Sequence, residues 1–266
     1  MEKKYILHNL PIIQRILRHS GGNNIIAIAS GMGHVGKTFI SVRLAQMLAA
    51  LGQKVLLFDA DLGLPNIDKE LNIPPIQDIS AVLKMAQPVN KSVFHYEKGN
   101  FDVITGQADE GAIGGMTSAQ IQLLIDDLLL FSSHYDYVII DCANNQWKYK
   151  FMTLAQTVFV VCMDEVTNLT ESYALVKQLY NKEQGRNIQV IVNMATSQKE
   201  GNRTYITLSK ACDEFLISPL NLAGIIQFDE SIVRAKNRQI SFSTDLLNTQ
   251  SMKDIEQILK TILIKN

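Results

Sequence analysis

The fold of this chain is decided by the stretch Asn24-Ile25-Ile26-Ala27-Ile28-Ala29-Ser30-Gly31-Met32-Gly33-His34-Val35-Gly36-Lys37-Thr38. The stretch opens with a short apolar run, which predicts a buried strand, and then turns through several glycines. From Gly31 the spacing is G-x-x-x-x-G-K-T, the pattern of a phosphate-binding loop (P-loop), and an apolar segment with helical periodicity follows. A chance glycine turn is the alternative, and it is disfavoured because the strand, the helix and all three fixed residues occur together.

Each residue type in this loop suits the binding of phosphate. Glycines allow the backbone to bend and to bring its N–H groups close to phosphate oxygens. The helix that starts near Lys37 points its positive N-terminal end at the same anion. We therefore expect Lys37 to reach the outer phosphates and the hydroxyl of Thr38 to ligate magnesium.

Composition excludes several classes of protein. Of the 266 residues, 47% are hydrophobic and 19% are charged, which is ordinary for a globular α/β protein. The formal net charge of −1 creates no global field that would draw the chain to nucleic acid, so a nucleic-acid partner is not expected. The chain has no run of eighteen apolar residues, so we expect no membrane span. Three cysteines fit no zinc or redox spacing, and they indicate a reduced, cytoplasmic setting in which Cys162 fills the core.

We divide the chain into an N-terminal helical extension, residues 1–23, and one domain, residues 24–266. Apolar residues of the extension follow helical spacing: Ile6, Leu10, Ile13 and Leu17. A helix that packs on the domain and a helix that touches a partner or a membrane are both open interpretations of this pattern. Beyond the extension, no linker rich in Pro, Gly or Ser divides the chain, which favours a single domain.

Apolar segments alternate with helical patterns along this domain. Strands are predicted at residues 24–30, 54–59, 101–105, 137–141, 157–163, 188–193 and 221–226. Helices are predicted at residues 37–51, 78–85, 118–132, 169–180, 201–215 and 251–264. Continuous Val/Ile-rich runs that alternate with helices indicate an α/β fold, with a mostly parallel sheet and helices on both faces.

Two of the predicted strands end in carboxylates. The strand 54–59 runs into the sequence Asp59-Ala60-Asp61, and the strand 137–141 ends in Asp141. Ligands of open α/β sheets bind at the carboxyl ends of parallel strands, so these side chains should lie beside the P-loop. An apolar strand that closes on an aspartate is typical of a magnesium site, which we assign to Asp141, and Asp61 is a candidate to orient the attacking water. An isolated aspartate after a strand is otherwise a turn or helix-cap residue.

Taken in order, these stretches resemble the MinD/ParA family of P-loop ATPases, and within it the flagellar-number branch, FlhG (FleN). The family's deviant P-loop, K-G-G-x-G-K-T, aligns with residues 32–38, and its first switch, D-A-D-x-G-L-x-N-x-D, is matched by residues 59–68. Weaker likenesses lie in the strands 101–106 and 135–141, in Val190-Ile191-Val192-Asn193 and in residues 222–229. The resemblance implies the P-loop NTPase fold of the SIMIBI, MinD-like class.

The resemblance also implies a set of site residues and partners. ATP or ADP would be held by Gly31, Met32, Gly33, His34, Val35, Gly36, Lys37, Thr38 and Phe39, with Asn193 at the adenine. Mg²⁺ would be held by Thr38, Asp61 and Asp141, and the catalytic residues would be Lys37 and Asp61. The family dimerises around ATP, so the implied partners are a second copy of the chain and a protein of the flagellar or cell-pole machinery.

Three departures from the family pattern bear on activity. Met32 occupies the position of the signature lysine, and a thioether cannot neutralise phosphate charge. His34 replaces a glycine and is expected either to crowd the loop or, when protonated, to add charge. The residues Cys142-Ala143-Asn144-Asn145 stand where the family has a glycine-containing switch. The pattern favours a weak ATPase switch, and the alternative is a hydrolysis-poor pseudo-ATPase that serves as a scaffold or regulator of a partner.

The C-terminal region leaves two further questions open. The last predicted helix has one apolar face, which favours packing on the sheet over a lipid anchor at the inner face of the cell membrane. That face consists of Ile255, Ile258, Leu259, Ile262 and Leu263. A small basic cluster consists of Arg234, Lys236 and Arg238, and it favours a solvated helix face over a ParA-like DNA surface. A filament-type partitioning protein therefore ranks third among the interpretations of function.

Overall fold

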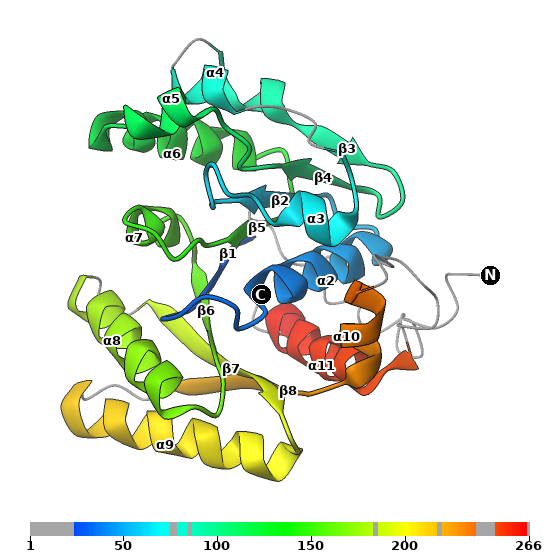
Figure 1. Ribbon diagram of the computed structural model, residues 1–266, viewed down its shortest axis with the longest axis vertical. Coiled ribbons are helices and arrows are strands. Elements are labelled where there is room, and N and C mark those ends of the chain that lie inside the picture. Colours follow the sequence, from blue (N-terminus) through cyan, green and yellow to red (C-terminus); the bar gives the residue numbers. More distant parts are fainter. Residues whose placement is uncertain are drawn as a thin grey trace.

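The computed structural model describes residues 24–74, 79–84, 87–182, 186–216, 220–237 and 248–264. Within these ranges an eight-stranded sheet runs through the centre of the molecule in the order β3-β4-β2-β5-β1-β6-β7-β8 (Figure 1). Its strands are β1 (Asn24–Ala29), β2 (Val55–Asp59), β3 (Phe94–Tyr96), β4 (Phe101–Ile104), β5 (Tyr137–Asp141), β6 (Thr157–Cys162), β7 (Asn187–Ala195) and β8 (Asn221–Gln227). The helix predicted for residues 1–23 lies outside the described ranges, so the division of the chain at residue 24 stays a prediction.

All neighbouring strands are parallel except the edge pair, in which β3 runs antiparallel to β4. The predicted mostly parallel sheet is therefore confirmed. Sequence reasoning did not predict β3, because the three residues of this strand show no apolar run and no sustained alternation. The strand β3 forms because its backbone pairs with the predicted strand β4.

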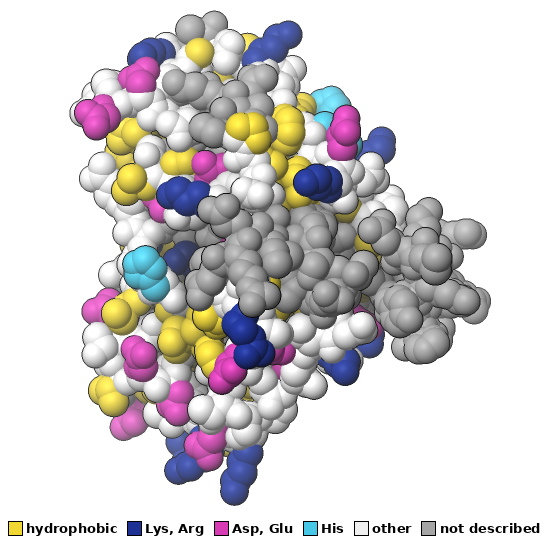
Figure 2. Space-filling view, turned by 45° about the vertical axis from the view of Figure 1, so that its right-hand side comes forward, with side chains coloured by type: hydrophobic (Ala, Val, Ile, Leu, Met, Phe, Trp, Pro, Cys, Tyr) yellow, Lys and Arg dark blue, Asp and Glu magenta, His cyan; other side chains and the backbone are white. Residues whose placement is uncertain are grey.

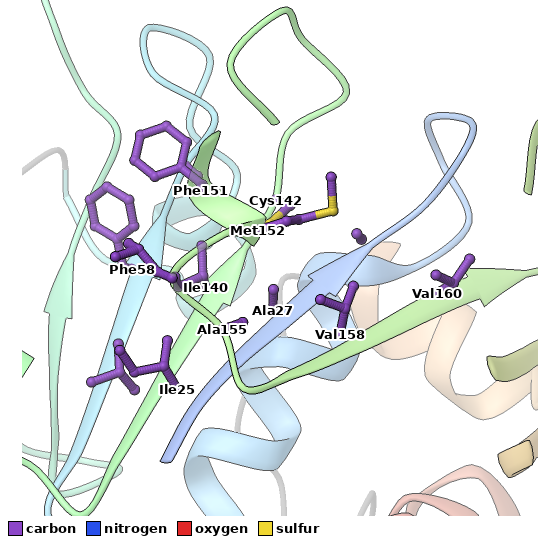
Figure 3. Packing of buried hydrophobic residues seen from close by; sticks show 14 of the residues in the cluster. Ile25, Ala27, Phe58, Ile140, Cys142, Phe151, Met152, Ala155, Val158 and Val160 are labelled. Carbon is purple, nitrogen blue, oxygen red and sulfur yellow. The ribbon is translucent and has the colours of Figure 1, made fainter. Parts of the chain in front are cut away.

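Helices cover both faces of the sheet, as expected. Their bounds are α2 (Lys37–Ala50), α3 (Ile67–Leu71), α4 (Ser80–Leu83), α5 (Glu110–Gly114), α6 (Ser118–Ser132), α7 (Lys148–Met152), α8 (Val166–Lys182), α9 (Gln198–Leu216), α10 (Glu230–Asn237) and α11 (Gln250–Ile264), with a 3₁₀ turn η2 at Val89–Ser92. Because side chains alternate along a strand, Ile25 and Ala27 of β1 face α6, α7, α8 and α9, while Ile26 and Ile28 face α2, α3 and α11. Figure 3 shows the first set, where Ile25 and Ala27 lie on the same face of the sheet as Phe58, Ile140 and Val158.

Four short helices of the described ranges were not predicted from the sequence: α3, α5, α7 and α10. The predicted elements include no helix between residues 59 and 78, yet Ile67–Leu71 forms α3. Its apolar residues Ile67 and Leu71 are four positions apart and fully buried, but two residues are too few to establish a helical period in the sequence. The helix exists because tertiary contacts stabilise a segment with weak local preference.

The apolar face of the last helix is buried in the fold. All five of its predicted face residues are at most 7% exposed, and α11 packs against α2 and β8. This arrangement agrees with the packing interpretation rather than with a free lipid anchor. In the described ranges no helix combines the length and the apolarity needed to cross a bilayer.

Candidate functional site

The P-loop connects the end of β1 to the start of α2, and two of its glycines are required by geometry. Gly36 has φ +88°, a left-handed conformation that side chains rarely adopt, and a Cβ there would lie 2.4 Å from Asn193 Nδ2. Gly31 has no such torsion, but a Cβ on it would lie 2.4 Å from the carbonyl carbon of Glu171 in α8. The loop is therefore clamped between α8 on one side and Asn193 on the other.

The two P-loop side chains assigned to phosphate and metal lie at the same end of the sheet. Lys37 Nζ donates to Ser30 Oγ at 2.9 Å, and Ser30 in turn donates to the carbonyl of Met32, so the lysine is folded back over its own loop. Thr38 Oγ1 donates to Asp141 Oδ2 at 2.6 Å. Burial lowers the pKa of Lys37, and the nearby Asp141 opposes that shift.

Two carboxylates face each other across neighbouring strands. Asp59 at the end of β2 is the direct register partner of Asp141 at the end of β5, and both are buried. Burial raises the pKa of both carboxyl groups, and Asp141 raises that of Asp59 further, while the bond from Thr38 opposes the shift at Asp141. Two buried carboxyl groups this close resist ionising together, and a bound cation would stabilise their charged forms.

Asp59 was not among the predicted site residues, yet it organises the loop that carries Asp61. Its carboxylate accepts the backbone N–H groups of Asp61, Asn66 and Ile67 at 2.9, 2.9 and 3.1 Å. These bonds hold the segment between β2 and α3 in one conformation. The motif D-A-D names this residue, but only the fold shows that its carboxylate is used internally rather than toward a ligand.

Asp61 itself lies half-buried at the mouth of the site. Its Oδ2 is 3.4 Å from Asn66 Nδ2, which leaves the carboxylate only weakly held. Burial raises the pKa of Asp61, while Lys37 and Lys69 lower it. Its carboxylate is thus oriented beside the P-loop lysine without a strong fixed partner, as expected for a residue that would contact water or a metal.

A cavity of about 820 Å³ opens over these residues. The predicted site residues that line it are Gly33, His34, Gly36, Lys37, Thr38, Phe39, Asp61, Asp141 and Asn193. Apolar side chains line the cavity as well, among them Met194, Ile226, Phe228 and Val233. A pocket lined by both charged groups and apolar side chains suits a ligand that carries phosphates and a flat base.

Three predicted P-loop residues do not line this cavity. Gly31 packs against α8, Val35 is buried, and Met32 is half-buried against the core on the α2 side of the sheet. Met32 therefore rests on apolar neighbours instead of extending from the loop. His34 has φ +60° and an exposed side chain, so the expected crowding of the loop is not seen.

Asn193 lies in β7 with its amide directed at the P-loop. The side chain is 4% exposed, and its Nδ2 donates to the carbonyl of Val35 at 2.8 Å. The amide oxygen is left to meet a ligand in the cavity. The structure thus brings Asn193 to the site from a distant part of the sequence, and its assigned contact with adenine stays a prediction.

The residues at the end of the sheet fit a magnesium ion bound together with phosphates. In the described part of the chain, no group of three or more His, Cys, Asp or Glu side chains is arranged to hold a metal on its own. Mg²⁺ commonly takes one or two carboxylates and completes its shell with water and phosphate oxygens. Asp141, Asp61 and the Thr38 hydroxyl supply oxygen ligands of that kind.

The loop after β5, in which the sequence pointed to residues 142–145 as a departure from the family pattern, makes contacts that the sequence did not predict. Cys142 is buried, and its N–H donates to the carbonyl of Ile28 in β1 at 2.9 Å. Asn144 Nδ2 donates to the carbonyl of Gly31 at 3.0 Å, and Lys148 Nζ donates to Asn144 Oδ1 at 2.8 Å. No sequence signal identifies the contacts to β1 and the P-loop, because they join segments more than a hundred residues apart.

Charges on the surface are mixed. Figure 2 shows lysine and arginine side chains interspersed with aspartate and glutamate over one face of the molecule, without a continuous basic area among the side chains that it colours. Of the predicted basic cluster, Arg234 pairs with Glu230 at 3.4 Å, and Arg238 lies outside the described residues. The visible arrangement agrees with a solvated helix face.

Comparison with known proteins adds independent information. Residues 26–242 match the family described as the CobQ/CobB/MinD/ParA nucleotide binding domain. The chain is 34% identical over 218 residues to the antiactivator FleN of Pseudomonas aeruginosa, an alignment that covers 81% of this chain and 77% of that protein. It is 28% identical over 263 residues to the flagellum site-determining protein YlxH of Helicobacter pylori, covering 95% and 87%.

Solved structures support the fold. The septum site-determining protein MinD complexed with Mg-ADP from Pyrococcus horikoshii superposes with a TM-score of 0.74 at 21% identity, covering 91% of this chain and 96% of that one. The cell division ATPase MinD of Pyrococcus furiosus gives a TM-score of 0.76 at 20% identity, covering 91% and 99%. The expected P-loop NTPase fold of the MinD class is therefore confirmed.

Proposed function

Because the chain belongs to the CobQ/CobB/MinD/ParA nucleotide-binding domain family, we propose that it is an ATP-binding switch that holds Mg-ATP or Mg-ADP in the cavity over the P-loop. One observation carries this proposal. Lys37, Thr38, Asp61 and Asp141 come from three neighbouring strand ends and meet in the lining of that cavity. No simple structural purpose requires two carboxylates, a lysine and a hydroxyl at one buried edge of a sheet.

Each of these residues has a separate task in the proposal. Lys37 would leave Ser30 to bind the outer phosphates, and Thr38 and Asp141 would hold magnesium. Bound magnesium would neutralise phosphate charge and orient the terminal phosphate. Asp61, weakly held at the cavity mouth, would orient the water that attacks. Asn193 and the apolar side chains of the cavity would receive the adenine.

The biological setting follows from similarity to FleN and YlxH, whose printed descriptions name an antiactivator and a flagellum site-determining protein. We propose that the chain acts in the cytoplasm as an ATP-dependent homodimer. It would regulate flagellar number or placement, or another process at the cell pole, through contact with a protein of that machinery.

Nucleotide-dependent thermal stability tests this function. A ligand that binds only the folded state stabilises it by about 4 kcal/mol at a thousandfold excess over its Kd. We expect millimolar Mg-ATP and Mg-ADP to raise the melting temperature of the natural protein, and Lys37→Ala to abolish most of the shift. Lys54→Ala, at an exposed lysine just before β2, is the matched control and should keep the shift. An unchanged melting temperature of the natural protein in both nucleotides would remove the proposal.

A second function is favoured by the replacements at the phosphate end. Met32 packs on the core and carries no charge, and Cys142 to Asn145 replace the family's switch. These features fit a scaffold that binds nucleotide and a partner but hydrolyses ATP poorly. Dimer formation by light scattering, measured beside ATP turnover, separates the two functions: a dimer that forms with ATP and shows no turnover above buffer is the scaffold.

A further inference from the structure

A short chain of hydrogen bonds joins α7 to the P-loop. Lys148, the first residue of α7, donates from Nζ to Asn144 Oδ1 at 2.8 Å. Asn144 donates from Nδ2 to the carbonyl of Gly31 at 3.0 Å. Asn144 lines the cavity together with Lys37, Cys142 and Ala143, and its two hydrogen bonds connect Lys148, which does not line the cavity, to the P-loop.

The ammonium group of Lys148 is not neutralised by a carboxylate of the described residues. In those ranges its contacts are the Asn144 oxygen and the face of Tyr149, 5.3 Å from the ring centroid. Glu171 of α8 attracts it from beyond ion-pair distance. The side chain is half-buried, and burial lowers the pKa of Lys148, with repulsion from Lys37 adding to the effect.

The two ammonium groups near the P-loop therefore lack an ion pair with a carboxylate of the described residues that would offset their repulsion. Lys37 and Lys148 repel each other, and the pKa of each is lowered by burial. Met32 and His34 of the P-loop bring no fixed positive charge between them. An anion placed next to Lys37 and Asn144 would attract both ammonium groups and offset their mutual repulsion.

We propose that Lys148 and Asn144 form the contact that recognises the terminal phosphate and so distinguishes ATP from ADP. The inference rests on the proposed nucleotide site and identifies its sensing element. Lys148 supplies positive charge from the same chain, and Asn144 positions it and contributes an amide donor at the cavity wall. On binding, the ammonium group exchanges the Asn144 oxygen for phosphate oxygen, which is a stronger, charge-assisted partner.

This assignment couples the nucleotide to α7. While Lys148 bonds to Asn144, the helix is tied through the loop after β5 to Gly31. When the ammonium group moves to a terminal phosphate, the position of α7 depends on whether the site holds ATP or ADP. A helix whose position depends on the terminal phosphate is what a switch needs in order to report its state to a partner.

The test compares two affinities in each variant by isothermal titration calorimetry. The ligands are a non-hydrolysable ATP analogue with Mg²⁺ and ADP with Mg²⁺, and the variants are Lys148→Met, Lys148→Arg and Asn144→Ala. The matched control is Lys150→Met, because Lys150 lies on the same helix and donates to the carbonyl of Ser118 at 3.1 Å, away from the cavity. Unchanged ADP binding shows in each variant that the site is still folded.

We expect Lys148→Met to lower the affinity for the ATP analogue about tenfold, which corresponds to roughly 1.4 kcal/mol of binding free energy. The affinity for ADP should stay within about twofold of that of the natural protein. Lys148→Arg should restore most of the difference, Asn144→Ala should reduce the preference for ATP, and Lys150→Met should change neither affinity. Equal effects on both nucleotides, or none, in Lys148→Met would overturn the role of Lys148, and the same result in Asn144→Ala would overturn that of Asn144. If the natural protein binds neither nucleotide, the proposed function itself fails.

Discussion

Two loops leave neighbouring strands of the sheet and meet over the same cavity, yet they are built on different principles. The P-loop, between β1 and α2, is defined by its backbone: Gly36 has a left-handed torsion, and Gly31 lies against α8 with no space for a side chain. The loop between β5 and α7 is defined by its side chains, since Cys142 is buried and Asn144 and Lys148 form contacts across it.

This difference determines which substitutions each loop tolerates and how readily its contacts can rearrange. A backbone that must bend and approach its neighbours permits few residue types, so the P-loop keeps a recognisable pattern. A loop that works through side chains can exchange one set of polar contacts for another. We infer that the backbone-built loop holds the nucleotide in a fixed geometry, and that the loop built on side chains is the one able to rearrange.

The largest effect should come from the backbone constraint in the P-loop. Gly31→Ala forces a Cβ into the carbonyl group of Glu171, and we expect a loss of about 2–3 kcal/mol of unfolding free energy. Gly33→Ala is the matched control: a Cβ there meets nothing within 4 Å, so its cost should stay below about 0.5 kcal/mol. Urea unfolding measures both, and equal losses would show that the loop is not constrained by contact with α8.

The second prediction asks which of the two loops limits catalysis. Met32→Lys places a cation at the position where the resemblance puts the family's signature lysine, and we expect turnover to rise about tenfold, on the order of 1.4 kcal/mol of barrier. Asp61→Ala in the same background should erase the gain, because the attacking water loses its orienting carboxylate. If turnover stays at background while ATP binds and the dimer forms, the loop after β5 is limiting and the scaffold function is favoured.

The third prediction concerns the buried charge at the end of β5. Burial raises the pKa of Asp141 above its unfolded value, so between the two values the folded state binds more protons than the unfolded state. Unfolding free energy should therefore fall as pH rises from about 4, near the unfolded value, through the folded pKa of about 6, without nucleotide or metal. Asp141→Asn should flatten this slope and stabilise the protein by about 1 kcal/mol near pH 8.

Denaturant midpoints at several pH values, in the presence of a chelator, measure this slope. Asp213→Asn, at an exposed aspartate on α9, is the control and should keep the pH dependence of the natural protein. Stability that rises with pH in the natural protein would contradict the prediction. The same Asp141→Asn variant should lose magnesium-dependent nucleotide binding. The two measurements together distinguish the stability that the buried carboxylate costs from the role that it has in binding magnesium.

The smallest effect is expected at Asn193, which supports the P-loop from β7. Asn193→Ala removes the bond to Val35 and the amide oxygen that faces the cavity, so ATP binding should weaken about threefold more than GTP binding. Competition binding with both nucleotides measures the ratio. Equal losses would assign Asn193 to the support of the loop alone.

Sequence reasoning predicted seven of the eight described strands, six of the described helices and the position of the P-loop, because each depends on a local pattern. Val/Ile runs indicate buried parallel strands, and the glycines before Lys37 indicate a phosphate loop wherever they occur. Asp61 and Asp141 were chosen as candidates because strand ends gather ligands; both line the cavity, and their roles stay predictions. By contrast, α3 carries only two apolar residues, and Asp59, Asn144 and Lys148 act through partners that no local pattern identifies.

The packing of Gly31 against Glu171 has a consequence for how such chains are inherited. That glycine is needed to keep α8 in place whether or not the protein ever cleaves ATP, so selection for folding alone would preserve it. A descendant that had lost its chemistry would still display much of the same signature. The presence of Gly31 is therefore no evidence by itself that a chain of this fold cleaves ATP.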